Sequence, residues 1–245
     1  MVTPAIRSQP APADAVFLPG PVLLLGAPGV GKGTQAQILM LGFNVPQVST
    51  GDLLRNHRAR HTKLGMLAED FMSQGQLVPD DLVNEMVADR LTHPDAQRGY
   101  ILDGFPRTLP QADWLDRHLA SGGVHDSILP VVALSITVEY DHLLHRITGR
   151  RTCPVCKSIY NVFSNPPTVS GVCDIEGATL IQRTDDSEEV FAERMKTFDL
   201  QTAPVVSHYR AQGRFEEIDG DHPVDQVAAA ITAALRRLRQ QERGA

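Results

Sequence analysis

A glycine-rich segment carries the strongest chemical signal in the sequence, and it reads Gly26-Ala27-Pro28-Gly29-Val30-Gly31-Lys32-Gly33-Thr34. Glycines let the backbone curl until successive N–H groups point inward, and the start of a helix adds unpaired donors at the positive end of its dipole. A lysine at the end of such a loop reaches the outer phosphates of a nucleoside triphosphate. We therefore predict a phosphate-binding loop made by Gly29, Val30, Gly31, Lys32, Gly33 and Thr34.

The residue after the lysine departs from the general pattern of such loops. Gly33 stands where that pattern has a Ser or Thr whose hydroxyl holds Mg²⁺, and Thr34 comes one place late. The metal must then be held by phosphates, water and a carboxylate elsewhere. Asp103 ends a predicted strand, where open α/β sheets bind ligands, so we predict that it orients the water shell of Mg²⁺.

Two polar side chains follow Asp103 closely. Arg107 presents a planar fork that can hold a second phosphate group through two hydrogen bonds. Gln111 carries an amide that can hydrogen-bond to a base. We therefore expect a second phosphate-bearing ligand to bind beside the one held by the glycine-rich loop.

The three cysteines predict a metal site. Cys153 and Cys156 form a C-x-x-C pair, and sixteen residues later Cys173 is followed at the same spacing by Glu176. This spacing is that of a two-knuckle zinc site with its last ligand changed to glutamate, and zinc accepts carboxylate oxygen. Asp174 adjoins Cys173 and is the poorer fourth ligand. The alternative is a metal-free segment held by hydrogen bonds.

The elements that must position these residues alternate between strand and helix, which predicts an α/β fold with a central parallel sheet covered by helices. Apolar runs predict strands at 22–25, 45–48, 100–102, 131–138 and 215–218. We expect helices after the glycine-rich loop and after Asp52, Pro79, Pro110, Tyr140 and Ser187. A last helix, 224–239, has one apolar face with arginines opposite, and we expect it to pack on the sheet.

Two segments interrupt this alternation. Residues 50–79 predict short polar helices, whereas 150–187 contain three prolines and all the cysteines and lack helical periodicity. The second segment is too long for an ordinary connection, which indicates a lid or small inserted domain.

Composition limits the class of protein. The 245 residues, 42% of them hydrophobic, suit one large α/β domain with inserts or two small domains. A net charge of -6 argues against a dedicated nucleic-acid binder, and no apolar run approaches the ~20 residues that span a bilayer. Residues 1–20 hold four prolines and predict a disordered leader, while three cysteines suit a reducing compartment, so we expect the cytoplasm.

Four segments together resemble the adenylate kinases: GAPGVGKGTQ, STGDLLR, GQLVPDDLV and LDGFPRTLPQA. The resemblance runs from about residue 22 to 235. It implies a monomer that reversibly transfers the γ-phosphoryl group of Mg·ATP to AMP, giving two ADP. It also implies a P-loop core (21–48, 80–149 and 188–245), an AMP-binding segment (49–79) and a mobile lid (150–187). The cysteine pattern is similar to the long-lid bacterial members, some of which use an acidic fourth zinc ligand.

Carried over residue by residue, the resemblance implies two nucleotide sites. The donor phosphates would meet 29–34 together with Arg146 and Arg150 at the hinge of the lid. The acceptor would meet Thr50, Arg55, Gly104, Arg107, Gln111, Arg183 and Arg194. The residues around the transferred group would be Lys32, Arg107, Arg150, Arg183 and Arg194. Phosphoryl transfer needs alignment and charge neutralisation, which this set supplies.

Other functions remain open from the sequence. The same fold could transfer from GTP to AMP, or from ATP to UMP or CMP; the long cysteine-bearing segment argues against the pyrimidine kinases and Gln111 favours adenine as the acceptor base. A zinc-bearing nucleotide-binding module without turnover is disfavoured because Lys32, Asp103 and Arg107 are all present. The apolar run Ile38-Leu39-Met40-Leu41 could pack against a partner or against the leader.

Overall fold

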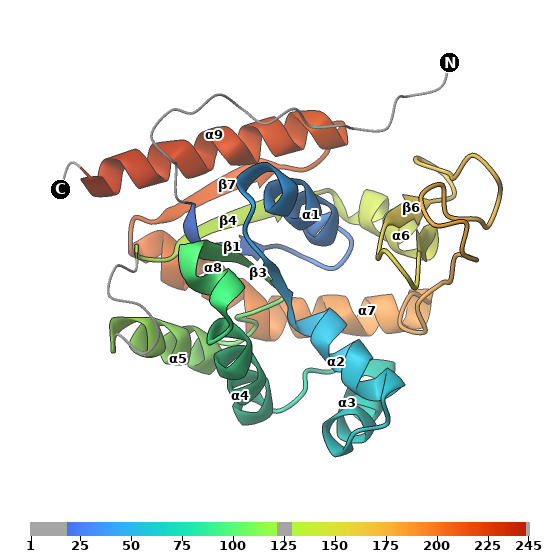
Figure 1. Cartoon of the computed structure of the whole chain (residues 1–245), viewed down its shortest axis with the longest axis horizontal. Coiled ribbons are helices and arrows are strands. Elements are labelled where there is room, and N and C mark those ends of the chain that lie inside the picture. The colour runs from blue at the N-terminus through green and yellow to red at the C-terminus, as the bar shows by residue number, and fades with distance from the viewer. Residues whose placement is uncertain (1–18, 122–128, 244–245) are drawn as a thin grey trace.

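The computed structural model describes residues 19–121 and 129–243, with side chains to 240. A parallel sheet with the strand order β2-β3-β1-β4-β7 forms its centre (Figure 1). The strands are β1 (Gly20–Leu25), β2 (Gln47–Ser49), β3 (Gly99–Asp103), β4 (Val132–Thr137) and β7 (Phe215–Asp219). The predicted fold class is confirmed, and a strand occurs at each of the five predicted places, although β2 begins two residues later than predicted.

Helices cover both faces of this sheet (Figure 1). They are α1 (Lys32–Phe43), α2 (Thr50–Ala59), α3 (Lys63–Ser73), α4 (Asp80–Leu91), α5 (Leu109–Ala120), α6 (Tyr140–Thr148), α7 (Glu188–Thr197), α8 (Ala203–Ala211) and α9 (Val224–Arg243), with a 3-10 helix η1 (Pro94–Arg98) and a π-helical turn η2 (Phe198–Thr202). No helix among the described residues is long and apolar enough to cross a membrane.

The side chains of β1 alternate between two cores, as the two-residue period of a strand requires. Val22 and Leu24 pack with residues of α1, α6, α7 and α9, whereas Leu23 and Leu25 pack with residues of α4, α5 and α8. All four are at most 3% exposed, which explains the uninterrupted apolar run in the sequence. The sheet is thus buried on both faces, so a ligand site is expected at the ends of its strands.

Two segments stand outside the sheet, as the sequence predicts. Helices α2 and α3 pack on each other between β2 and α4. In residues 150–187 the regular structure is a short antiparallel hairpin of β5 (Arg150–Thr152) and β6 (Ile159–Asn161), and no helix occurs there. Both segments lie on the same side of the molecule in Figure 1.

Several bounds predicted from the sequence are wrong. Helices α2 and α5 begin earlier than expected because Ser49 and Thr108 cap them: the Ser49 hydroxyl accepts from Asp52 N at 3.3 Å, and the Thr108 hydroxyl accepts from Gln111 N at 3.2 Å. The predicted leader ends too late, since Pro19 is buried and β1 begins at Gly20. Residues 1–18 lie outside the described residues.

The arginines of α9 do not all oppose its apolar face. Arg239 is 3% exposed, and its guanidinium donates to the carbonyl oxygens of Pro19 (2.6 Å), Pro21 (2.8 Å) and Pro130. Periodicity could not predict this, because the acceptors come from segments that are distant from α9 in the sequence. The expectation that α9 packs on the sheet is confirmed by the fully buried Ile231 and Leu235.

Candidate active site

The glycine-rich loop joins the carboxyl end of β1 to the first residue of α1. Gly29 and Gly31 adopt left-handed backbone angles, with φ of 92° and 100°, which residues with a Cβ rarely adopt. Gly31 is the N-cap of α1 and supplies no side chain to the cap. The first N–H groups of α1 and the concave loop therefore remain available to an anion, as the sequence predicts.

Lys32 folds back over this loop. Its ammonium group donates to the carbonyl oxygens of Gly26 (2.8 Å) and Ala27 (3.0 Å). Desolvation by burial lowers the pKa of Lys32 to about 7; the charge of Asp103 opposes this shift, and nearby arginines add to it. The charged form of Lys32 is thus destabilised in the free protein, and a bound polyphosphate would stabilise it.

Asp103 ends β3 directly beside the loop. Its Oδ2 accepts from Gln47 Nε2 at 2.9 Å, and a Cβ added to Gly33 would lie 3.6 Å from the same oxygen. The position that lacks the magnesium-binding hydroxyl therefore faces the carboxylate that we predict to replace it. Gln47 was not predicted from the sequence, because only the pairing of β2 with β3 brings it to Asp103.

The structure brings four of the predicted cations together from separate elements. Arg107, Arg150 and Arg194 all lie near enough to Lys32 to lower its pKa. They come from the loop after β3, from β5 and from α7 respectively. This convergence could not be derived from the sequence positions alone, since the first and last of the four are 162 residues apart (194 − 32).

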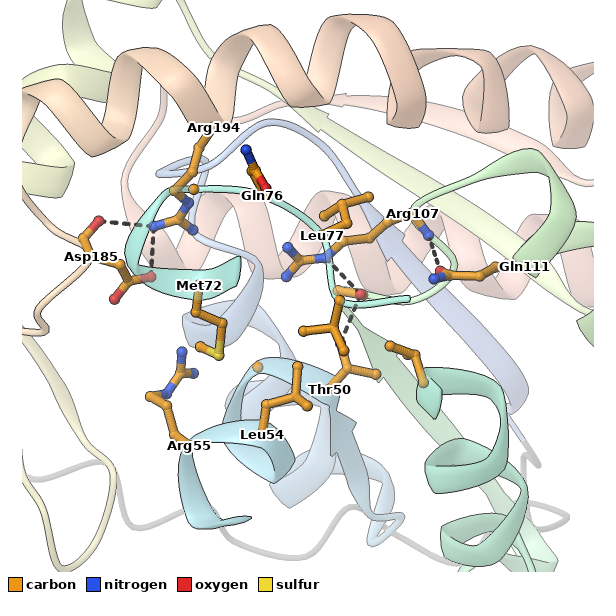
Figure 2. A pocket seen from close by; sticks show the side chains of 15 residues that line it. Thr50, Leu54, Arg55, Met72, Gln76, Leu77, Arg107, Gln111, Asp185 and Arg194 are labelled. Carbon is orange, nitrogen blue, oxygen red and sulfur yellow. Dashed lines mark hydrogen bonds and ion pairs between the residues drawn. The ribbon is translucent and has the colours of Figure 1, made fainter. Parts of the chain in front are cut away.

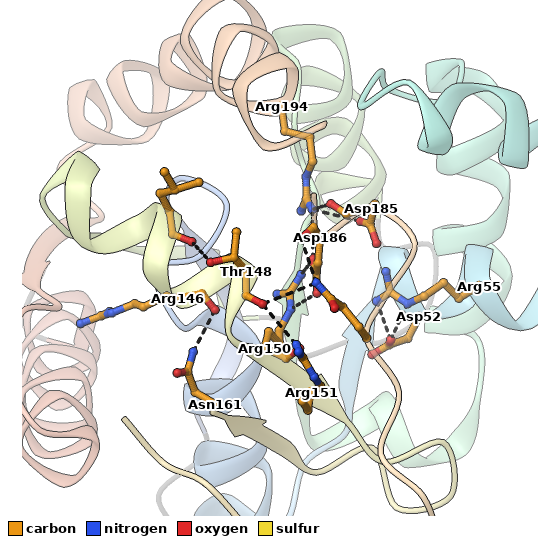
Figure 3. Close-up of polar contacts among 12 residues, drawn as sticks. Asp52, Arg55, Arg146, Thr148, Arg150, Arg151, Asn161, Asp185, Asp186 and Arg194 are labelled. Carbon is orange, nitrogen blue, oxygen red and sulfur yellow. Dashed lines mark hydrogen bonds and ion pairs between the residues drawn. The ribbon is translucent and has the colours of Figure 1, made fainter. Parts of the chain in front are cut away.

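Two adjacent carboxylates hold Arg150 and Arg194 in place (Figure 3). Asp186 accepts two hydrogen bonds from Arg150, one of them at 2.9 Å from Nε. Asp185 accepts from Arg194 Nη1 at 3.0 Å, and Asp186 lies 3.9 Å from the same nitrogen. Neither aspartate has a predicted role in the sequence. The sequence feature that could have indicated their role is the position of the two aspartates directly after Arg183 and Thr184.

Positive charge accumulates beyond what these carboxylates compensate. Burial, followed by the proximity of Arg150 and Arg55, lowers the pKa of Arg183 to about 10. Burial also lowers the pKa of Arg194 to about 10. Groups that disfavour their own charged form in this way are typical of a site that binds a polyanion.

Arg146 lies apart from this cluster (Figure 3). Its guanidinium donates to Gly220 O at 3.0 Å and forms an ion pair with Asp221 at 3.4 Å. A longer contact of 3.5 Å reaches Val30 O in the phosphate-binding loop. Arg146 therefore joins α6, the loop before α9 and the glycine-rich loop, on the donor side of the predicted site.

An open pocket of about 600 Å³ adjoins the arginines. Its polar lining includes Arg55, Arg107, Arg194 and Gln111, and its apolar lining consists of Leu54, Met72, Leu77, Val78 and Val83. Arg194 lies on one side of the pocket and Gln111 on the other, with Arg107 between them (Figure 2). The lining suits a small ligand that is anionic at one end.

Thr50 and Gly104 are joined at the floor of this pocket. The Thr50 hydroxyl donates to Gly104 O at 2.8 Å, and Arg107 Nε donates to the same oxygen at 2.8 Å. On the other side Arg55 pairs with Asp52, at 2.6 Å from Nη2 to Oδ1. All of the predicted acceptor residues except Arg183 line the pocket.

The three cysteines come together outside the pocket. Their sulfur atoms lie within 4.8 Å of one another, and those of Cys156 and Cys173 are 3.6 Å apart. A tetrahedral zinc site with bonds of about 2.3 Å has sulfur–sulfur edges of about 3.8 Å, so the group fits zinc. The exposed carboxylate of Glu176 is not part of this close group.

Tyr160 is a further neighbour of this group that the sequence analysis missed. Its hydroxyl lies 3.5 Å from Cys173 Sγ and accepts from Asp174 N at 2.9 Å. This contact lowers the pKa of the Cys173 thiol to about 6. The thiolate is the form in which cysteine binds metals.

A parallel sheet whose first strand leads into an anion-binding loop, with a lysine and several arginines beside it, defines a P-loop phosphoryl-transfer enzyme. Comparison with known proteins identifies its family. Residues 24–214 match the family model described as adenylate kinase. The chain belongs to the adenylate kinase family and is a nucleoside monophosphate kinase.

Individual relatives support this assignment over most of the chain. The adenylate kinase of Acidothermus cellulolyticus is 46% identical over 215 residues, covering 88% of this chain and 97% of the relative. That of Thermoanaerobacter sp. is 44% identical over 214 residues, covering 87% and 97%. That of Carboxydothermus hydrogenoformans is 42% identical over 217 residues, covering 88% and 99%.

Proposed function

We propose that the enzyme binds ATP at the glycine-rich loop and AMP in the adjoining pocket, and transfers the γ-phosphoryl group between them to give two ADP. The convergence of Lys32, Arg107, Arg150 and Arg194 between the loop and the pocket carries this proposal. A site that joins two phosphate chains needs positive charge at their meeting point, because the transition state spreads negative charge over the equatorial oxygens.

The donor side is formed by 29–34, Arg146 and Arg150. The N–H groups of the loop bind the β- and γ-phosphates, and Lys32 leaves its carbonyl partners to span the transferring and bridging oxygens. Arg150 is oriented toward the same region by Asp186.

The acceptor side is formed by the pocket. Arg55, Arg107, Arg183 and Arg194 hold the phosphate of AMP, while Thr50, Gly104 and Gln111 face the nucleoside. The attacking phosphate oxygen is already ionised, so no side chain need act as a general base. The work of the protein is to align the two nucleotides, neutralise their charge and exclude water when the lid closes.

Asp103 would orient the water shell of the magnesium ion that accompanies ATP, the cofactor that adenylate kinases use. The ion would neutralise charge on the phosphates. The placement of Asp103 beside Gly33 supports this role, since its Oδ2 lies 3.6 Å from where the Cβ of a Ser or Thr at that position would be.

Cys153, Cys156 and Cys173 would hold a structural zinc ion, with Glu176 as the fourth ligand. Glu176 lies in the turn that follows Cys173, closed by a hydrogen bond from Gly177 N to Cys173 O at 2.9 Å. Asp174 is the weaker candidate because its Oδ1 already accepts from Thr168 N at 2.9 Å. A Glu176→Gln variant that retains zinc as tightly as the wild type, measured against a competing chelator, would remove Glu176 from the site.

The segment 49–79 would then move as the AMP-binding segment and 150–187 as the lid, around the core formed by 21–48, 80–149 and 188–245. Contacts already join the two mobile segments, since Arg58 Nη1 donates to Thr184 Oγ1 at 3.2 Å. We further propose a monomer that works in the cytoplasm.

The test is a coupled assay with Mg·ATP and AMP, beside GTP, UMP and CMP and a Lys32→Ala variant. We expect stoichiometric ADP from ATP and AMP, and loss of turnover in the variant. Faster turnover with GTP and AMP would change the donor assignment. Tight nucleotide binding with no turnover of any pair would overturn the catalytic proposal.

A further inference from the structure

Gln111 is held in one orientation by groups outside the pocket. Its Oε1 accepts from Arg107 N at 2.7 Å, and its Nε2 donates to Asp80 Oδ1 at 2.6 Å. The side chain is 2% exposed. A backbone N–H can only donate, so the amide oxygen must face Arg107 and the amide nitrogen must face Asp80.

Asp80 belongs to a second fixed chain of hydrogen bonds. The backbone N–H of Gln111 donates to Thr108 Oγ1 at 3.2 Å, and that hydroxyl then donates its single proton to Asp80 Oδ2 at 2.8 Å. Both carboxylate oxygens of Asp80 are thereby required as acceptors. A flipped Gln111 amide would set its nitrogen against the N–H of Arg107 and its oxygen against the carboxylate of Asp80, so it would lose both bonds.

In this fixed orientation one N–H of Gln111 Nε2 and one lone pair of Gln111 Oε1 remain for a ligand. Adenine offers a donor, the exocyclic amino group, next to a ring nitrogen that accepts, and these match the amide as it is held. A 6-oxopurine places a carbonyl oxygen where adenine has the amino group. Its oxygen would then meet Oε1 of Gln111, and two acceptors would face each other in a buried site.

We propose that Asp80 is a positioning residue that makes the acceptor site selective for adenine over 6-oxopurines by preventing the Gln111 amide from flipping. This inference rests on the proposed role of Gln111 in reading the acceptor base. The Thr50 hydroxyl adds to the selectivity, because its proton is already donated to Gly104 O and it can only accept from a ligand.

The experiment compares AMP with inosine monophosphate as acceptors in Asp80→Asn. An asparagine can face Gln111 with either end of its own amide, so the flipped state then loses only the bond from Arg107 N instead of both bonds. We expect the ratio of kcat/KM for AMP to that for inosine monophosphate to fall about tenfold, the effect of one mispaired buried group. The KM for ATP should change less than about twofold, since Asp80 lies on the acceptor side.

Asp81→Asn is the matched control. Asp81 is the exposed neighbour of Asp80 in the first turn of α4, so its variant removes the same charge from the same helix terminus. We expect its acceptor ratio to equal that of the wild type. Equal ratios in both variants would overturn the proposal, because Asp80 would then serve only to stabilise α4.

Gln111→Leu separates this inference from the proposed function. If that variant keeps the wild-type acceptor ratio, Gln111 does not read the base and the acceptor assignment fails. If Gln111→Leu loses the preference for AMP but Asp80→Asn keeps it, only the role of Asp80 is overturned.

A measurement on the wild type covers the case in which Asp80→Asn does not fold. In a ¹⁵N-labelled sample, the side-chain N–H of Gln111 that is bonded to Asp80 should exchange with solvent far more slowly than those of exposed glutamines such as Gln74 and Gln240. Exchange as fast as in those residues would show an amide free to rotate, and the proposal would fail.

Discussion

Lys32 is the residue whose chemistry depends most on the fold. As a free side chain it would be a permanent cation at neutral pH, but its surroundings bring its pKa to about 7. A bound triphosphate supplies the negative charge that the site lacks and raises that pKa again. Between pH 7 and the higher pKa of the complex, binding of ATP must therefore take up a proton.

The affinity for Mg·ATP should accordingly fall as pH rises from 7.5 to 9, by up to about tenfold per unit, because the free enzyme loses the proton that the complex needs. Below about pH 7 the lysine is already charged and this dependence ends. Calorimetry in two buffers of different ionisation enthalpy should record the proton uptake. In Lys32→Arg the uptake should vanish; an unchanged uptake would assign it to another group.

Arg107 tests the geometry of the acceptor side. Its Nε donates to Gly104 O, which leaves the remaining nitrogens of the planar fork for a phosphate group. Lysine would keep the charge but lose the fork, so Arg107→Lys should raise the KM for AMP about ten- to hundredfold. The KM for ATP should change little. Steady-state kinetics with each substrate varied would contradict the assignment if both values rose equally.

At the scale of an element, the glycine-rich loop depends on backbone conformations that only glycine tolerates. Gly26 has a φ of 132°, and an added Cβ would lie 2.4 Å from Ile136 O. Gly26→Ala should therefore lower the free energy of unfolding by at least about 2 kcal/mol. Gly42 is the matched control: it lies within α1 with nothing near an added Cβ, so Gly42→Ala should add about 0.5–1 kcal/mol. Denaturant unfolding should show that Gly26→Ala lowers the free energy of unfolding and that Gly42→Ala raises it.

The proposed lid, residues 150–187, contains the smallest of the three buried apolar clusters among the described residues. Its buried cluster consists of Cys153, Tyr160, Cys173 and Leu180, two of which are the proposed zinc ligands. A chelator should therefore lower the Tm at concentrations where kcat is still unchanged at assay temperature, because the metal stabilises the fold and takes no part in the chemistry. Calorimetry and the coupled assay on the same samples make this comparison. Loss of activity in a protein of unchanged Tm would make the metal catalytic.

At the scale of the whole molecule, Arg239 connects segments that are far apart in the sequence. Its guanidinium satisfies buried carbonyl groups of Pro19, Pro21 and Pro130 at the end of the sheet opposite the active site. Arg239→Leu would leave these acceptors unpaired and should lower the free energy of unfolding by about 3 kcal/mol. The kcat should stay near that of the wild type at a temperature where both are folded.

Gln240 provides the comparison for Arg239. It is the next residue of α9 and is exposed, so Gln240→Leu should change the free energy of unfolding by less than about 0.5 kcal/mol. Equal effects of the two substitutions in denaturant unfolding would show that the buried carbonyl groups find other donors.

The sequence determined the fold class and the list of chemical groups, because both are local properties. Strands that are buried on both faces read as uninterrupted apolar runs, and the conformations of the glycine-rich loop require glycine at fixed positions. The spacing of Cys153, Cys156 and Cys173 is also a local property of the sequence, and their sulfur atoms come together in the structure as predicted.

Only the tertiary structure decided how these groups act on one another. Asp185 and Asp186 orient the arginines, Gln47 supports Asp103, and Asp80 fixes the amide of Gln111; each partner comes from another element or loop. Hydrogen bonds and charge interactions depend on distances of a few ångströms, and a sequence pattern with a period of two or four residues carries no information about contacts between distant segments. The kinds of chemical group in the site could therefore be predicted from the sequence, whereas the geometry of the site and its pKa values depend on tertiary packing.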